Sequence, residues 1–140
     1  ANNALTIWPI ITADVNLPAG KVHFILAHPS VPMTPLKRAM RDAQIHVFGQ
    51  LVSKSAYPTV LMGDFNTVPW TSSYLDVMRT QKLYGNLLTS SWPAYLHGFG
   101  IAIDQILAGK GAVVTNMRTG PVLQSDHRAR VAELHLQPAD

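Results

Sequence analysis

Val60-Leu61-Met62-Gly63-Asp64-Phe65-Asn66 is the stretch that decides the fold and the chemistry expected of this 140-residue chain. Its apolar residues are typical of a buried strand, and Gly63 suits an abrupt end to that strand because glycine accepts backbone angles that other residues resist. Side chains two residues apart point to the same side of an extended backbone, so we expect Asp64 and Asn66 to converge on one point. A carboxylate that accepts a proton, beside an amide that donates a hydrogen bond, is suited to position a water molecule against a phosphate or a carbonyl group.

Strands and helices alternate on both sides of this stretch. A helix is expected from the N-cap Thr34 to about Ser53, and a shorter one at 71–81. We expect strands at residues 22–27, 59–62, 112–115 and 131–136, and a further apolar run at 101–107. The residues expected to face inward on the helices are Leu36, Met40, Ala43, Val47 and Leu51, then Leu75 and Met78. This alternation predicts an α/β fold in which residues 1–140 form a single domain or a part of one, with a mixed β-sheet of about five to six strands and helices on one face.

The composition favours a globular domain. The chain is 47% hydrophobic and 14% charged, and no apolar run approaches the roughly 20 residues that a membrane-spanning helix needs. It has no cysteine, which excludes disulfides and thiolate metal sites. The net charge of +3 favours anionic partners, but the basic residues are scattered along the sequence, so a solvated surface and a nucleic-acid patch both remain open.

Three aspartates and two histidines lie beside apolar strand segments. Carboxylates at such places are costly to desolvate unless they are paired, hydrogen-bonded or bound to a cation. Strand ends of an α/β sheet gather at one crevice, so we expect these side chains to share one site. They are Asp64, Asp104, Asp126, His28 and His127.

These residues carry a resemblance to a known family. Gly63-Asp64-Phe65-Asn66, Ile103-Asp104-Gln105-Ile106-Leu107 and Ser125-Asp126-His127-Arg128 resemble three consecutive motifs of the endonuclease/exonuclease/phosphatase superfamily, which has the deoxyribonuclease I-like fold. His28 is similar to the histidine that precedes these motifs in the deoxyribonuclease branch. The resemblance extends over residues 22–136, and one departure is Gln105, where related bacterial sequences often carry histidine.

The resemblance implies a role for each motif residue in hydrolysis of a phosphate ester. Asp64 would orient and deprotonate the attacking water, and Asn66 would hold that water or a phosphate oxygen. His127 would hydrogen-bond the scissile phosphate, and Asp104 would pair with a histidine, above all His127, to fix its tautomer. His28 would contact the phosphate or protonate the leaving oxygen.

The resemblance also implies a divalent metal. Asp126 would help to bind Mg²⁺ or Mn²⁺, a hard cation that suits oxygen ligands. The family's first half supplies the principal metal-binding Glu, whereas the single Glu of this chain, Glu133, follows every motif. The chain therefore resembles the C-terminal portion of a domain about twice its length, one half of a four-layer α/β sandwich.

Several expectations about partners follow from this half-domain interpretation. An isolated half would expose the sheet face meant for the other half, so we expect contact with an N-terminal half or formation of a homo-oligomer. Some bacterial relatives carry membrane helices ahead of this domain, so a membrane tether in the full-length protein is also an expectation. The substrate is expected to be a phosphate ester, with nucleic acid, phospholipid and small phosphodiesters all open. The alternatives are a fragment inactive by itself and a non-catalytic binding module that keeps the fold.

Overall fold

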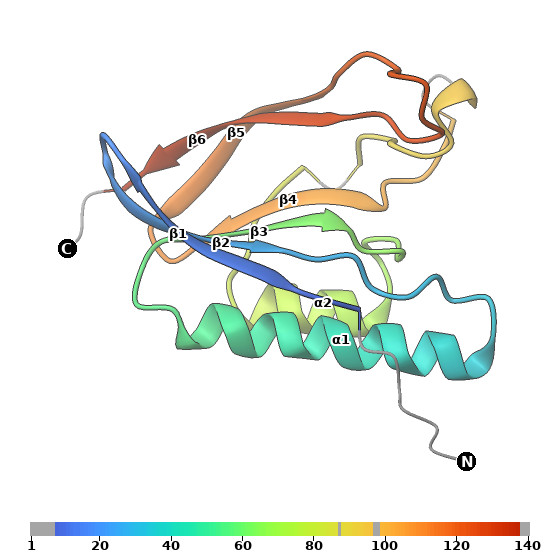
Figure 1. Cartoon of the computed structure of the whole chain (residues 1–140), viewed down its shortest axis with the longest axis horizontal. Coiled ribbons are helices and arrows are strands. Elements are labelled where there is room, and N and C mark those ends of the chain that lie inside the picture. Colours follow the sequence, from blue (N-terminus) through green and yellow to red (C-terminus); the bar gives the residue numbers. More distant parts are fainter. Residues whose placement is uncertain (1–7, 87, 97–98, 138–140) are drawn as a thin grey trace.

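The computed structural model describes residues 8–86, 88–96 and 99–137 (Figure 1). A four-stranded sheet has the order β1-β2-β3-β4, formed by β1 (Ile11–Leu17), β2 (Gly20–Leu26), β3 (Thr59–Asp64) and β4 (Asp104–Gly109). Strands β2 and β3 are parallel, whereas β1–β2 and β3–β4 are antiparallel. Strands β5 (Ala112–Thr119) and β6 (Arg130–Leu136) form a separate antiparallel pair. The α/β class is therefore confirmed, with the six strands of the described residues divided between two sheets.

Two helices cover one face of the larger sheet, and the β5–β6 pair lies over the other (Figure 1). They are α1 (Pro35–Lys54) and α2 (Ser72–Thr80), and a short 3-10 helix, η1 (Ala94–Leu96), precedes β4. Thr34 is the N-cap of α1 as expected, since its side-chain oxygen accepts a hydrogen bond from the Lys37 backbone N–H at 3.2 Å. In the described residues, no helix combines the length and the apolar character needed to cross a membrane.

Strand β1 is absent from the sequence-based expectations, although its sequence alternates strictly between apolar and polar residues. That alternation is the signal of a half-exposed strand. β1 lies at the edge of the sheet and joins β2 through a two-residue turn, with Leu17 paired to Gly20. Gly20 has a φ of +136°, a backbone conformation that favours glycine.

The expected inward face of α1 is wrong, although the helix itself is confirmed. Leu36 is 64% exposed and Val47 is 40% exposed. The buried residues of α1 are Arg41, Gln44, Ile45, Phe48, Gly49 and Val52. Because this buried stripe contains two polar side chains, an apolar periodicity cannot identify it. The stripe packs on Ile25, Leu61 and Leu107 of the sheet, in one cluster with residues of α2.

The opposite face of the sheet has a smaller core. Val22, Val60 and Ala108 of the sheet are buried there, and Val114, Leu134 and Leu136 of the β5–β6 pair pack against them. The coverage is incomplete, because Ile11 is 62% exposed and Leu26 is 37% exposed. The expected uncovered sheet face therefore corresponds to the β1 side and the carboxyl ends of β2 and β3.

Candidate active site

Two carboxylates face each other at the edge of the sheet. Asp64 is the last residue of β3 and Asp104 is the first residue of β4, and the two are paired in the antiparallel register. The residue before Asp64 is Gly63, whose φ is +145° and where an added Cβ would overlap the carbonyl oxygen of Ala27. Only glycine permits this close approach of β3 to the end of β2.

His127 bridges the two carboxylates. Its Nδ1 lies 2.9 Å from Asp104 Oδ2, and its Nε2 lies 3.8 Å from Asp64 Oδ2. An ionised carboxylate only accepts hydrogen bonds, so the Nδ1–H donates to Asp104 and fixes the orientation of the ring. This is the pairing expected from the sequence. His28 approaches from β2's side, with its Nε2 3.7 Å from Asp64 Oδ2.

The environment shifts the pKa values of the central pair. Burial, followed by the negative charge of Asp104, raises the pKa of Asp64, although the Asn66 backbone N–H and both histidines oppose this shift. For His127, burial lowers the pKa, but the hydrogen bond to Asp104 and the charges of Asp104, Asp64 and Asp126 outweigh it, and the net shift is upward.

Asn66 connects the turn after β3 to the His28 loop. Its backbone N–H donates to Asp64 Oδ1 at 2.8 Å, and its side-chain Nδ2 donates to the Pro29 carbonyl oxygen at 2.9 Å. Its φ of +47° is a left-handed conformation that asparagine tolerates better than most residues. The side chain of Asn66 thus holds the loop that carries His28.

Asp126 lies apart from this cluster. Its exposed carboxylate accepts a hydrogen bond from Trp92 Nε1 at 3.1 Å, and this bond is the main reason that its pKa is lowered. The ring of Trp92 in turn lies 6.5 Å from that of His127, measured between centroids. The position of Asp126 is thus tied to the segment before η1.

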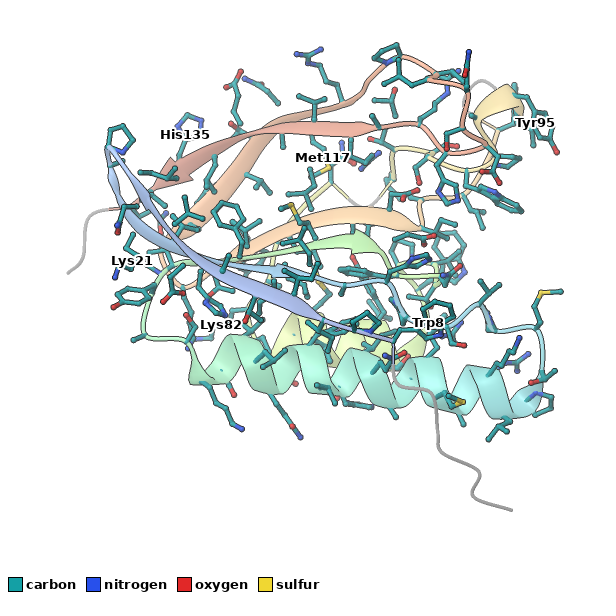
Figure 2. The ribbon with its side chains drawn as sticks, in the orientation of Figure 1. Trp8, Lys21, Lys82, Tyr95, Met117 and His135 are labelled. Atoms are coloured by element: carbon teal, nitrogen blue, oxygen red, sulfur yellow. The ribbon has the colours of Figure 1, made fainter. Side chains whose placement is uncertain are left out.

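A cavity of about 700 Å³ opens beside the cluster. His28, Asp64, Asp104 and His127 line one part of it. Its apolar lining includes Ile11, Leu26, Met62, Ile106 and Leu123. Trp8 and Tyr95 lie at the same end of the molecule, one toward α1 and the other on η1 (Figure 2). The polar groups therefore line one part of a cavity whose remaining lining is largely apolar.

A model of the Endonuclease/Exonuclease/phosphatase family matches residues 2–127 of this sequence. The chain belongs to this family. A search of curated protein sequences finds no match.

Solved structures share the fold at low sequence identity. An endonuclease/exonuclease/phosphatase from Beutenbergia cavernae is 21% identical with a TM-score of 0.71, covering 91% of this chain and 39% of its own. A conserved protein of unknown function from Enterococcus faecalis is 21% identical with a TM-score of 0.68, and the match covers 84% of this chain and 51% of that protein. A Staphylococcus aureus beta toxin mutant with bound magnesium ions is 16% identical with a TM-score of 0.61, and the match covers 92% of this chain and 57% of the toxin. This chain thus spans 39% to 57% of the length of these three structures.

Enzymes of this family commonly depend on a divalent metal. Within the described residues, Asp64, Asp104 and His127 each offer a ligand atom, and these atoms lie within 4.8 Å of one another. Two carboxylates suit Mg²⁺ or Mn²⁺, but three ligands fill only half of an octahedral shell. The donor set fits a divalent cation in part. The assignment of Asp126 as a metal ligand stays a prediction.

Several buried polar residues that support the candidate site are absent from the sequence-based expectations. Ser91 is fully buried, its Oγ accepts a hydrogen bond from the Asp104 backbone N–H at 3.1 Å, and its carbonyl oxygen accepts one from Arg128 N at 2.8 Å. It therefore links the two segments that carry Asp104 and His127. Arg41 and Gln44 of α1 are also buried beside the site. Isolated Ser, Gln and Arg residues in a helix or loop have no periodic signal that marks them.

Proposed function

We propose that this chain supplies the water-activating and phosphate-binding half of a metal-dependent phosphohydrolase of the phosphodiesterase or nuclease type. The observation that carries the proposal is the placement of Asp64 between His127 and His28, with Asp104 holding His127 from the far side. A carboxylate flanked by two imidazoles offers a base and acids within a few ångströms of one reacting phosphorus atom.

Each residue then has a distinct part in the reaction. Asp64, with its raised pKa, would orient the attacking water and accept its proton. His127, with its raised pKa, would donate a hydrogen bond to the phosphate oxygen on which negative charge develops. Asp104 would hold the His127 ring in the required tautomer, as orienting carboxylates do for other catalytic histidines.

The remaining residues complete the site. His28 is 63% exposed and would protonate the leaving oxygen or contact the phosphate. Asn66 would orient the water through its acceptor Oδ1, or a phosphate oxygen through the second hydrogen of Nδ2. A bound Mg²⁺ or Mn²⁺ would neutralise charge on the phosphate, and Asp64 and Asp104 are the carboxylates of this chain placed to hold it, with Asp126 a further candidate.

We further propose that another half of the domain packs on the uncovered sheet face. The exposed Ile11 and Leu26 and the apolar lining of the cavity support this proposal, because monomeric proteins rarely leave such surfaces open. The other half would supply the remaining metal ligands, so this chain alone would hydrolyse substrate very poorly. The substrate is a phosphate ester, whether in a nucleic acid, a phospholipid or a small phosphodiester. Pairing of two copies of this chain is the alternative occupant of the face.

Hydrolysis of bis(p-nitrophenyl) phosphate with Mg²⁺ by the full-length protein tests the function. We expect Asp64→Asn to lower kcat by roughly 100-fold or more. The matched control is Asp76→Asn on the exposed face of α2, which should keep full activity. Equal activity of the two variants would contradict the role of Asp64. A folded full-length protein that binds the diester without hydrolysing it would instead favour the non-catalytic binding module.

A further inference from the structure

Two polar side chains of α1 are buried without a part in the proposed chemistry. Arg41 is 7% exposed and Gln44 is 6% exposed, on the same stripe as the core residues Ile45 and Phe48. Arginine and glutamine are seldom buried to this extent unless their polar groups have partners. The partners of Gln44 are backbone groups, and those of Arg41 are the Asp42 carboxylate and the backbone of the turn after β3.

Gln44 holds the His28 loop from the helix side. Its Oε1 accepts a hydrogen bond from the Ser30 backbone N–H at 3.4 Å, and its Nε2 donates to the carbonyl oxygen of Trp8 at 3.1 Å. Ser30 follows His28 by two residues, and the Trp8 ring lies 6.0 Å from the His28 ring between centroids. One amide therefore contacts both the loop that carries His28 and the segment before β1 that supplies its aromatic neighbour.

Arg41 holds the turn after β3 in a similar way. Its Nη1 donates to the carbonyl oxygen of Asn66 at 3.2 Å. Its Nε and Nη2 both donate to Asp42 Oδ1, at 3.0 and 2.7 Å, and Ser73 of α2 donates to the same oxygen. The guanidinium thus binds the Asp42 carboxylate on one side and the carbonyl oxygen of Asn66, which has a left-handed backbone conformation, on the other.

These bonds form a closed circuit around the site. The Asn66 side chain donates to Pro29, which joins the turn after β3 to the His28 loop, and Arg41 and Gln44 connect each of these segments to one face of the same helix. His28 itself has only a ring contact with Trp8 and a 3.7 Å approach to Asp64 among the described residues, neither of which is a hydrogen bond. The position of its ring therefore depends on the backbone that the circuit holds.

We propose that Arg41 and Gln44 are positioning residues that set the separation of His28 from the Asp64–Asn66 turn. The inference rests on the proposed function, since that separation matters when both residues act on one phosphate. A displacement of about 1 Å in a catalytic group can cost on the order of 100-fold in rate, so bonds remote from the phosphate can control the reaction. A purely structural role, fastening α1 to the sheet, is the competing explanation.

The NMR spectrum of this chain, recorded without metal, tests the proposal independently of any activity. Gln44→Met removes the hydrogen bonds of the amide while nearly preserving side-chain length, and Arg41→Met removes those of the guanidinium and shortens the side chain. The matched controls are Gln50→Met and Arg38→Met, at exposed positions of the same helix. The signals to follow are the ring resonances of His28 and His127 and the side-chain amide of Asn66.

We expect a local response from the two buried positions. Gln44→Met should shift or broaden the His28 ring resonances, and Arg41→Met should shift the Asn66 amide and speed its hydrogen exchange, with His127 unchanged in both. The controls should change none of these signals. A loss of thermal stability with unaltered His28 and Asn66 signals would show that the two residues are only structural and would overturn the proposal.

Milder substitutions keep the test decisive if a methionine variant fails to fold. Gln44→Glu keeps the acceptor for Ser30 but loses the donor to Trp8, and Arg41→Lys keeps the charge but cannot reach both Asp42 and Asn66. In the full-length protein, we expect both variants to lower kcat by roughly 10-fold while KM stays within about twofold. If both variants had the same kcat as the control variants, the proposal would be overturned. A wild-type protein that shows no hydrolysis would refute the proposed function, and the NMR signals would still decide on positioning.

Discussion

His127 donates through Nδ1 to Asp104 across 2.9 Å, and its other ring nitrogen lies 3.8 Å from Asp64. One imidazole therefore joins two carboxylates that face each other on neighbouring antiparallel strands. Like charges this close repel each other, and the His127 imidazole lies between them. Besides burial, the charge of Asp104 raises the pKa of Asp64; against burial, both carboxylates raise the pKa of His127, so the predictions on pH concern these two groups.

Asp104→Asn should lower the pKa of His127. The hydrogen bond and charge of Asp104 are the leading contributions that raise this pKa against the effect of burial, so their removal should leave burial dominant. The titration of the His127 ring resonances by NMR, in metal-free buffer, measures the change. Asp14→Asn is the control, because Asp14 pairs with His23 at 2.6 Å outside the site. A His127 titration that is the same in both variants would contradict the assigned pairing.

Asp64→Asn should stabilise the chain at neutral pH. The folded chain raises the pKa of Asp64, so it binds the proton more tightly than the unfolded chain does. The free energy of unfolding therefore falls as pH rises from about the ordinary value of 3.8 through the raised value, and the ionised carboxylate remains unfavourable above it. Asparagine keeps an oxygen for the Asn66 N–H without the charge. We expect a gain in the free energy of unfolding at pH 7 that vanishes under acidic conditions.

Thermal unfolding monitored by circular dichroism at several pH values measures this gain. Asp76→Asn serves as the control, because it loses only an exposed ion pair with His46, and it should change stability by less than about 0.5 kcal/mol. If Asp64→Asn were destabilising at pH 7, the favourable interactions of Asp64 with the histidines and with Asn66 would outweigh the cost of burial. A stability gain that persisted in acid would have to come from another source.

Some features of the site and of the packing have a local signal in the sequence and others have none. Asp64 follows an apolar run that ends at Gly63, whereas Asp104 interrupts the expected run at 101–107 and is the first residue of β4 in the structure. Asp126 accepts a hydrogen bond from Trp92, thirty-four residues away, and no local pattern reveals that contact. The buried stripe of α1 was mispredicted because Arg41 and Gln44 lie where an apolar periodicity expects aliphatic residues.

Phe65→Ala should cost about 3–5 kcal/mol of stability. Phe65 is 2% exposed, and its ring lies 5.8 Å from Phe48 and 6.1 Å from Tyr74. It follows Asp64 directly, so the same side chain anchors the turn after β3 to the helices. Leu36→Ala is the matched control, since Leu36 is 64% exposed, and it should cost less than about 0.5 kcal/mol. Urea unfolding measures both changes. If the two variants lost the same free energy of unfolding, Leu36 would have to face inward, as the periodicity of α1 predicts, and not outward as observed.

Substitution on the uncovered sheet face should reduce self-association of this chain. Ile11 and Leu26 are 62% and 37% exposed beside the apolar cavity, so we expect association through this face when no other half covers it. Leu26→Lys would place a charge there and should shift the mass measured by analytical ultracentrifugation toward the 15.3 kDa monomer. Val47→Lys is the control, because Val47 is 40% exposed on α1, away from this face. A chain that is already monomeric, or a mass lowered equally by both variants, would contradict association through the uncovered face, because the prediction requires that face specifically.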